Sequence, residues 1–206
     1  MNDAIPPTNG GGAPPALALV LPPAPAEVKE LADACVRYVE AVYRLRLDFQ
    51  PETLSVLDHY LASRRPDFEH EPQAAGLIAR VAAAYFGEVV RHKFSSFWHL
   101  GSEDDPSTWQ LRFEAVYLSF SPYEIAYDAI TLGDQGEPTA QLNLDDEDRD
   151  VVEERLAELP PASDEEFFAL TTRLEVLEIA VDAIKARMMS NGLGEVGFSS
   201  EDYERD

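Results

Sequence analysis

Residues 82–98 read AAAYFGEVVRHKFSSFW, and within them the hydrophobic pattern changes from helical to extended. A glycine inside a helix costs about 1 kcal/mol relative to alanine. Gly87 therefore indicates either close backbone packing or a site, and Ala83, one turn earlier, leaves a narrow face for a neighbouring element. Glu88 adds a carboxylate beside that face. The stretch predicts a packing contact with one polar group.

Three helices are predicted on the N-terminal side, the last of which contains this glycine. The first covers about residues 27–47 and carries an apolar stripe at helical spacing. The stripe consists of Val28, Leu31, Cys35, Val39 and Val42. The second begins at Pro51, which suits a first helical turn, and is expected to end at Pro66. The third runs from Pro72 to about Phe94.

On the C-terminal side we expect a small antiparallel sheet of about three strands. Residues 97–100 are short and aromatic, and residues 108–114 alternate between apolar and polar positions. Residues 115–121 alternate as well. Their phase slips by one between Phe113 and Val116, which indicates a bulge or a very tight turn.

Three further helices follow the predicted sheet. Residues 122–133 begin with a serine cap and a proline, residues 134–144 are expected to form a loop, and residues 145–159 form a helix with acidic residues in its first turn. The last helix starts at a capping box, Ser163 to Glu166, and ends at Asn191-Gly192.

The last predicted helix carries the clearest periodic signal in the chain. Its apolar residues alternate steps of three and four over three heptads. They are Phe167, Leu170, Leu174, Leu177, Val181, Ile184 and Met188. Such a stripe forms either the central core helix of the domain or the seam of a homodimer. Phe168 and Ile179 widen the apolar face, which favours the core.

These elements predict an α+β fold, with about six helices around the sheet, in a single globular domain of residues 27–191. Residues 1–26 are rich in Pro and Gly and are expected to be a disordered arm. Within it, Leu17 to Leu21 are apolar enough to dock on a partner or on the domain itself. Residues 192–206 are expected to be a loose acidic tail.

The charge of the chain is strongly negative and unevenly distributed. The net charge is −23; residues 1–100 hold 9 Lys and Arg against 12 Asp and Glu, and residues 101–206 hold 7 against 27, a balance of −20. Such a chain repels phosphate backbones and anionic lipid, which argues against nucleic acid and membrane surfaces as partners. A basic protein partner is compatible with the charge, and an acidic face kept for solubility is the alternative.

Cysteine content and hydropathy bear on the location of the protein. Cys35 is the only cysteine, so an intramolecular disulfide and a Cys-rich zinc site are excluded, and its apolar surroundings predict a buried thiol. Residues 1–26 lack the basic start of a signal peptide, and no run approaches the roughly 20 apolar residues of a membrane span. We expect a cytoplasmic protein.

One set of metal-type ligands could converge, namely Glu88, His92 and His99, because the first two lie one helical turn apart. Against a metal site, His92 stands in the basic triplet Arg91-His92-Lys93, and the helical His-Glu-x-x-His motif is missing. A structural role is therefore preferred. The motifs for phosphate binding, dinucleotide binding and nucleophilic catalysis are missing as well, so the sequence indicates no cofactor and no catalytic residues.

Aromatic side chains gather in and around the predicted sheet. The group comprises Trp98, Trp109, Tyr117, Phe120, Tyr123 and Tyr127. They could line a groove, but packing against the helices is the favoured interpretation. For a partner that binds near the glycine, the predicted contact residues are Tyr85, Gly87, Glu88, Trp98 and Trp109.

Several short patterns occur in a fixed order. Leu47 to Asp58 reads Leu-Asp-Phe-x-x-Glu-x-Leu-x-x-Leu-Asp, Tyr85 to Val89 reads Tyr-x-Gly-Glu-Val, and a tryptophan and an aromatic-Ser-Pro helix entry follow. In this order the chain resembles a family of uncharacterised bacterial domains over roughly residues 48–130. The family has no assigned activity, so the resemblance supports the fold and implies no function. Ala83 stands where that family has glycine, and Ser95-Ser96-Phe97 replaces its Gly-rich approach to the tryptophan.

Three functional hypotheses follow. The leading one is a non-catalytic, cytoplasmic protein-interaction or scaffold domain that binds another protein through its acidic half or its aromatic sheet. The second is a metal-assisted hydrolase that uses Glu88, His92 and His99. The third is an acidic mimic of nucleic acid that occupies the basic cleft of a nucleic-acid-binding protein.

Overall fold

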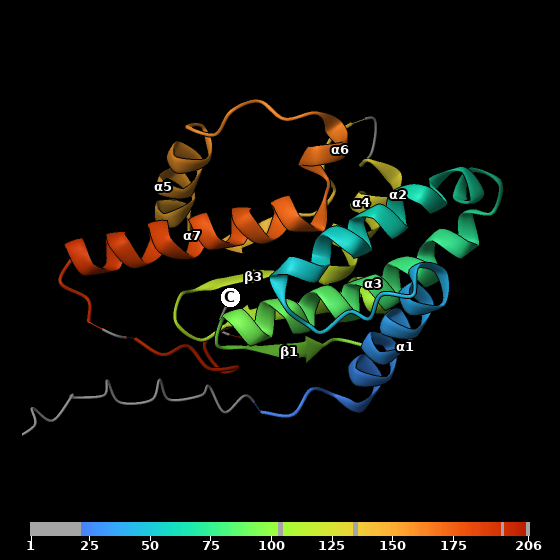
Figure 1. Ribbon diagram of the computed structural model, residues 1–206. Coiled ribbons are helices and arrows are strands. Elements are labelled where there is room, and N and C mark those ends of the chain that lie inside the picture. Colours follow the sequence, from blue (N-terminus) through green and yellow to red (C-terminus); the bar gives the residue numbers. More distant parts are fainter. Residues whose placement is uncertain (1–21, 103–104, 134–135, 195, 205–206) are drawn as a thin grey trace, which may run out of the picture.

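The computed structural model describes residues 22–102, 105–133, 136–194 and 196–204. These residues form seven α-helices, two short 3-10 helices (Pro51–Thr53 and Pro106–Thr108) and one four-stranded antiparallel sheet, so the predicted α+β fold is confirmed (Figure 1). The helices and strands are α1 (Ala26–Tyr43), α2 (Leu54–His70), α3 (Pro72–Lys93), β1 (Ser96–Leu100), β2 (Trp109–Phe113), β3 (Leu118–Phe120), α4 (Pro122–Thr131), β4 (Leu142–Leu144), α5 (Asp146–Leu156), α6 (Asp164–Phe167) and α7 (Leu170–Ser190).

The four strands pair in sequence order as a meander. β1 and β2 pair along their full length, and Leu111 of β2 lies opposite Phe120 of β3. The phase slip seen in the sequence is a tight turn of residues 114–117 between β2 and β3, as predicted. β4 was expected to be part of a loop. Its three residues pair with β3, and Leu142 and Leu144 pack against the core, but so short a strand has no readable alternation.

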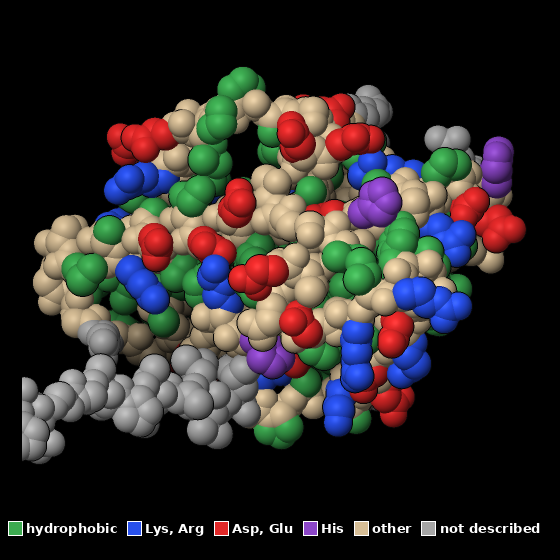
Figure 2. Space-filling view, viewed as in Figure 1, with side chains coloured by type: hydrophobic (Ala, Val, Ile, Leu, Met, Phe, Trp, Pro, Cys, Tyr) green, Lys and Arg blue, Asp and Glu red, His purple; other side chains and the backbone are tan. Residues whose placement is uncertain are grey.

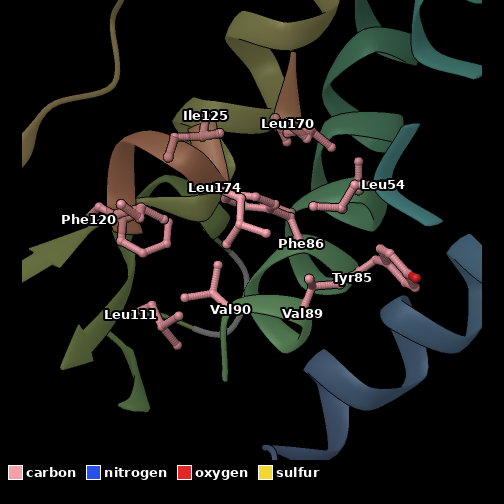
Figure 3. Close-up of a cluster of buried hydrophobic side chains, with 14 of the residues drawn as sticks. Leu54, Tyr85, Phe86, Val89, Val90, Leu111, Phe120, Ile125, Leu170 and Leu174 are labelled. Carbon is pink, nitrogen blue, oxygen red and sulfur yellow. The ribbon is translucent and has the colours of Figure 1, made fainter. Parts of the chain in front are cut away.

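Helix α3 is the centre of the molecule. It packs against α1, α2 and α4 and leads directly into β1 (Figure 1). Its small residues Ala79, Ala82, Ala83 and Ala84 are almost completely buried, which lets neighbouring helices approach closely. Beside this face, side chains from α2, α3, α4, α7, β2 and β3 meet in one core, including Leu54, Phe86 and Phe120 (Figure 3).

The stripe on the last helix belongs to this core. Leu170, Leu174, Leu177, Val181, Ile184 and Met188 are buried, and only Phe167 is exposed. Ser163 forms the predicted capping box with Glu166, but the helix that it starts is broken after one turn into α6 and α7. Because the stripe is covered within the chain, the structure supports the favoured interpretation of a core helix over the alternative of a homodimer seam.

One helix boundary and one buried helix face differ from those expected. α2 continues through Pro66 to His70, because the proline ring lies on the exposed side while Phe68, two residues later, packs into the core. α1 buries Ala32 and Val36 in place of part of the predicted stripe, and Val42 is 50% exposed.

The two ends of the chain were predicted to be loose. Residues 1–21 of the predicted arm lie outside the described residues. In the segment expected to be a loose tail, Phe198 donates its backbone N–H to the carbonyl of Glu114 (2.7 Å), and the ring of Tyr203 stacks on Tyr117. The physical reason is that the β2–β3 turn leaves backbone groups free for pairing. No helix in the described part of the chain is both long and apolar enough to cross a membrane.

Candidate functional site

The predicted contact at Gly87 is a packing contact between α3 and β1. A Cβ atom built on Gly87 would lie 2.2 Å from Cζ2 of Trp98, well inside van der Waals distance. The indole of Trp98 therefore occupies the space that any other residue at position 87 would need. Close backbone packing, one of the two interpretations of the glycine, is confirmed.

The carboxylate of Glu88 is saturated by neighbouring donors. Trp98 Nε1 donates to Oε1 (2.7 Å), and Arg91 Nη1 donates to both oxygens (2.9 and 3.1 Å). Arg91 is only 2% exposed, and it also donates to the backbone carbonyls of Ser96 (3.4 Å) and Pro22 (2.5 Å). This cluster joins α3, β1 and the residues before α1, and both charges of the ion pair are satisfied within it.

Two predicted partner-binding residues are in the core. Tyr85 and Trp109 have no exposed surface, because the ring of Tyr85 stacks on Phe49 and the ring of Trp109 packs against Trp98 and Arg80. Their polar atoms are also occupied. The Tyr85 hydroxyl accepts from the Phe49 N–H (3.0 Å), and Trp109 Nε1 donates to the Ser102 carbonyl (2.9 Å). Neither side chain is accessible to a partner in this fold, so the prediction that they contact one is corrected.

The three residues considered as an alternative metal site do not converge. Nδ1 of His92 lies 2.6 Å from the backbone carbonyl of Glu88, and its ring stacks on Phe49. His99 follows Trp98 in β1, so its side chain lies on the opposite face of the strand. There, burial and the charge of Arg112 lower the pKa of His99. Across the described ranges, no three His, Cys, Asp or Glu side chains are placed to hold a metal ion.

A groove of about 640 Å³ lies elsewhere, beside the C-terminal end of α7. We call it the α7 groove. Its lining residues come from the α3–β1 junction, the β2–β3 turn, the end of α7 and the segment that follows. They are Ser95, Glu114, Ala115, Lys185, Met188, Met189, Leu193, Gly194, Val196 and Gly197. Hydrophobic side chains gather at this end of α7 in Figure 2.

One wall of the α7 groove is formed by a helix end that turns back on itself. Gly192 has a positive φ of 73°, and the N–H groups of Gly192 and Leu193 donate to the carbonyls of Met189 (3.1 Å) and Met188 (2.9 Å). This is the Schellman arrangement, in which the residue after the glycine meets the helix one turn back. It holds Leu193 next to Met188. The predicted stop at Asn191-Gly192 is confirmed, and it builds the wall.

The floor of the α7 groove is held by hydrogen bonds from three parts of the chain. The Ser95 hydroxyl donates to the carboxylate of Glu114, and the Glu114 N–H donates to the Ser95 carbonyl (3.0 Å). The Phe198 N–H donates to the Glu114 carbonyl. This bond attaches the segment after α7, which forms the second wall of the groove, to its floor. The hydroxyl of Tyr203 binds the β2–β3 turn. It accepts from the Leu118 N–H (3.1 Å) and lies 2.8–3.2 Å from three backbone carbonyl oxygens. Those carbonyls belong to Phe113, Val116 and Leu118.

The surface of the α7 groove is apolar with a few polar groups at its edge. Met189 is 73% exposed, Leu193 49% and Val196 40%. Glu114 and Lys185 supply one charge of each sign, and the Ser95 hydroxyl is already bonded. Methionine side chains are flexible and polarizable, and they suit surfaces that adapt to an apolar ligand. The arrangement can bind an apolar segment; it does not present an activated nucleophile.

No protein-family model, curated protein or solved structure matches this chain. The resemblance to an uncharacterised bacterial domain family therefore stays a prediction.

Sequence reasoning missed the α7 groove for a specific reason. Its second wall is formed by Gly194, Val196 and Gly197, which lie in the segment expected to be loose. The usable signals were the helix stop at Gly192 and the pair Met188-Met189 at the end of a stripe. They predict that the chain reverses direction beside apolar side chains. They do not show that the Phe198 N–H would donate to the carbonyl of Glu114, 84 residues earlier.

Proposed function

We propose that this protein is a non-catalytic interaction domain that binds an apolar segment of another protein in the α7 groove. The observation that carries the proposal is the groove itself, about 640 Å³ in size, with Met189, Leu193 and Val196 exposed along it. Contiguous exposed apolar surface, edged by polar groups, is typical of protein interaction sites. Ligand pockets for small molecules have similar volumes, but their polar groups converge on the ligand, whereas here the Ser95 hydroxyl already donates to the Glu114 carboxylate.

The charge of the chain supports the choice of a protein partner. Residues 101–206, which supply nine of the ten groove residues, hold 27 Asp and Glu against 7 Lys and Arg. Acidic side chains spread over the helices of this half in Figure 2. An apolar segment flanked by basic residues would be drawn to this surface, since complementary charge raises association rates and selects partners. We place the protein in the cytoplasm, where the free thiol of Cys35 would stay reduced.

Methionine-methyl NMR on the full chain tests the proposal. The chain has three methionines, Met1, Met188 and Met189, so protein labelled with 13C at the methionine methyls gives two signals that report on the α7 groove. Peptides are selected on the wild-type protein from a random display library and then titrated. We expect the selected peptides to be apolar and to shift the signals of Met188 and Met189.

Two matched double variants identify the binding surface. Met189→Glu with Leu193→Glu places charge in the groove, and the proposal predicts at least about a tenfold loss of peptide affinity, or 1.4 kcal/mol. Tyr38→Glu with Val42→Glu makes the same change on the exposed face of α1, where these residues are 46% and 50% exposed, and should leave affinity unchanged. Equal affinity for both variants, or a library without peptides that shift the two signals, would contradict the proposal.

A further inference from the structure

We propose that residues Leu17 to Leu21 of this same chain occupy the α7 groove when no partner is bound. The inference rests on the proposed function, because it requires that the groove accept an apolar segment. It goes further by naming the resident occupant and by making the domain self-inhibited. Three observations carry it: where the described chain starts, how far the segment reaches, and its lack of charge.

The described chain starts beside the α7 groove. Its first residue, Pro22, is held by Nη2 of Arg91, which lies 2.5 Å from the Pro22 carbonyl. Nε of the same guanidinium donates to the Ser96 carbonyl (3.4 Å), and the neighbouring residue Ser95 lines the groove. One buried arginine therefore fixes Pro22 close to one end of the groove. The blue start of the described chain and the red C-terminal segment both lie on the β1 side of the molecule (Figure 1).

The segment is long enough and needs no linker. Leu17-Ala18-Leu19-Val20-Leu21 comes directly before Pro22 in the sequence. Five extended residues span up to about 17 Å. Because Pro22 is anchored, the segment is confined near the groove, and tethering through a short connection produces effective concentrations in the millimolar range. Even a weak intrinsic affinity would then fill the groove.

The chemistry of the segment matches that of the groove. Residues 4–26 contain no charged side chain, in a protein with a net charge of −23. An uncharged segment meets no repulsion from the acidic second half. Leu17, Leu19 and Leu21 are large apolar side chains just before the anchor, and Met189, Leu193 and Val196 offer exposed apolar surface to them. Burial of such surface stabilises the contact by about 25 cal/mol per Å².

A spin label in the arm tests occupancy in the full chain. Ala16→Cys provides a labelling site, because burial of Cys35 raises the pKa of its thiol and keeps it unreactive. With the label oxidised, we expect the Met188 and Met189 methyl signals to broaden and lose most of their intensity, and to regain it when the label is reduced. In a matched protein with Leu17, Leu19 and Leu21 changed to Ser, the intensity should be retained. Unchanged intensity in the first protein would overturn the inference.

A mixing experiment separates this occupant from a second copy. One protein carries the spin label at Ala16→Cys but no 13C. It is mixed with a second protein that carries 13C at its methionine methyls but no spin label. If residues 17–21 bind within their own chain, the Met188 and Met189 signals keep their intensity in the mixture. Loss of intensity in the mixture would show that the arm binds another copy, and the inference would be wrong.

A peptide of residues 16–23 separates failure of this inference from failure of the proposed function. We expect the free peptide to shift the Met188 and Met189 signals of the triple-Ser protein. If the wild-type arm fills the groove nine-tenths of the time, the peptide should bind the wild type about tenfold more weakly. Peptide binding of equal strength to both proteins would leave the α7 groove as an interaction site but refute the arm as its occupant. If neither this peptide nor any selected peptide shifts the signals, both proposals fail.

Discussion

The indole of Trp98 lies against the backbone of Gly87 with no room for a methyl group between them, and this contact fixes β1 on α3. The same indole donates to the Glu88 carboxylate, so the packing contact and the Arg91 ion pair share one side chain. Displacing the ring would therefore disturb both.

Gly87→Ala is expected to destabilise the protein by about 1–3 kcal/mol, the usual cost of overpacking a core. The new methyl group would push the Trp98 ring away and lengthen its hydrogen bond to Glu88. Urea denaturation followed by tryptophan fluorescence measures the change.

Gly76→Ala in the same helix is the control: its Cβ would meet only the Tyr123 hydroxyl at 3.5 Å, an ordinary contact. There the higher helix propensity of alanine should leave stability unchanged or raise it by up to about 1 kcal/mol. Equal losses in the two variants would contradict this account.

Asp58 of α2 caps α7 and accounts for the break between α6 and α7. Its carboxylate accepts from the N–H groups of Leu170 (2.7 Å) and Thr171 (3.1 Å) and from the Thr171 hydroxyl (2.9 Å). Asp58→Ala should lower the free energy of unfolding by about 1–2 kcal/mol, the upper part of the range for a lost cap. Asp58→Asn keeps an acceptor oxygen and should cost less. The two unfolding midpoints in urea test this order.

The same residue should make stability depend on pH. Burial raises the pKa of Asp58 above its ordinary value of 3.8, against the opposing effect of the hydrogen bonds from Leu170 and Thr171. A raised carboxyl pKa means that the folded state holds the proton more tightly, so this contribution to stability is complete below pH 3.8 and is lost as the pH rises through the folded pKa. The stability of wild type relative to Asp58→Asn should therefore fall from pH 3.8 toward neutrality. A difference that rises with pH would refute the assignment.

Tyr203 is predicted to stabilise the β2–β3 turn through its hydroxyl. Tyr203→Phe keeps the ring on Tyr117 but removes the acceptor for the Leu118 N–H and the donor to the nearby carbonyls. The expected loss is about 1–2 kcal/mol, the cost of leaving part-buried polar groups unpaired. Burial raises the pKa of Tyr203 to about 12, so its advantage over Phe is present below the ordinary value of 10 and lost as the pH rises through 12. Unfolding curves at neutral and alkaline pH check both statements, which fail if the two proteins differ by the same amount throughout.

Cys35 is expected to be inert in the folded protein. It lies on the buried face of α1, and burial raises the pKa of its thiol well above the ordinary value, so almost no thiolate forms at neutral pH. A maleimide reagent should label the native protein only at the rate of unfolding and label it fully in urea, as read by intact mass. Rapid labelling of the native state would show that the α1 face opens.

The local elements of this fold could be predicted wherever the deciding residues lie close together in the sequence. The Ser163–Glu166 capping box, the stop at Gly192 and the turn of residues 114–117 are each set by neighbours within a few positions. The close contact at Gly87 was predicted as well. A glycine destabilises the helix that contains it, so its presence there indicates that a neighbouring group needs the space.

Features that depend on distant partners could not be predicted. α7 begins at Leu170 because Asp58, 112 residues earlier, supplies its cap. β4 exists because β3 offers it an edge, and the second wall of the α7 groove depends on the bond from Phe198 to Glu114. A single sequence contains no periodic signal for such contacts, so the candidate site emerged only from the three-dimensional arrangement.

The hydroxyl of Tyr203 also carries a consequence for biosynthesis. It bonds to Leu118, which the ribosome has released 85 residues earlier. At about 5–20 residues per second, the hairpin waits about 4–17 s for its last partner. During that interval the carbonyls of the turn remain bonded to water, and the ring of Tyr117 is not covered by Tyr203. Nascent chains that end before this tyrosine therefore lack the hydrogen bonds that its hydroxyl gives to the β2–β3 turn.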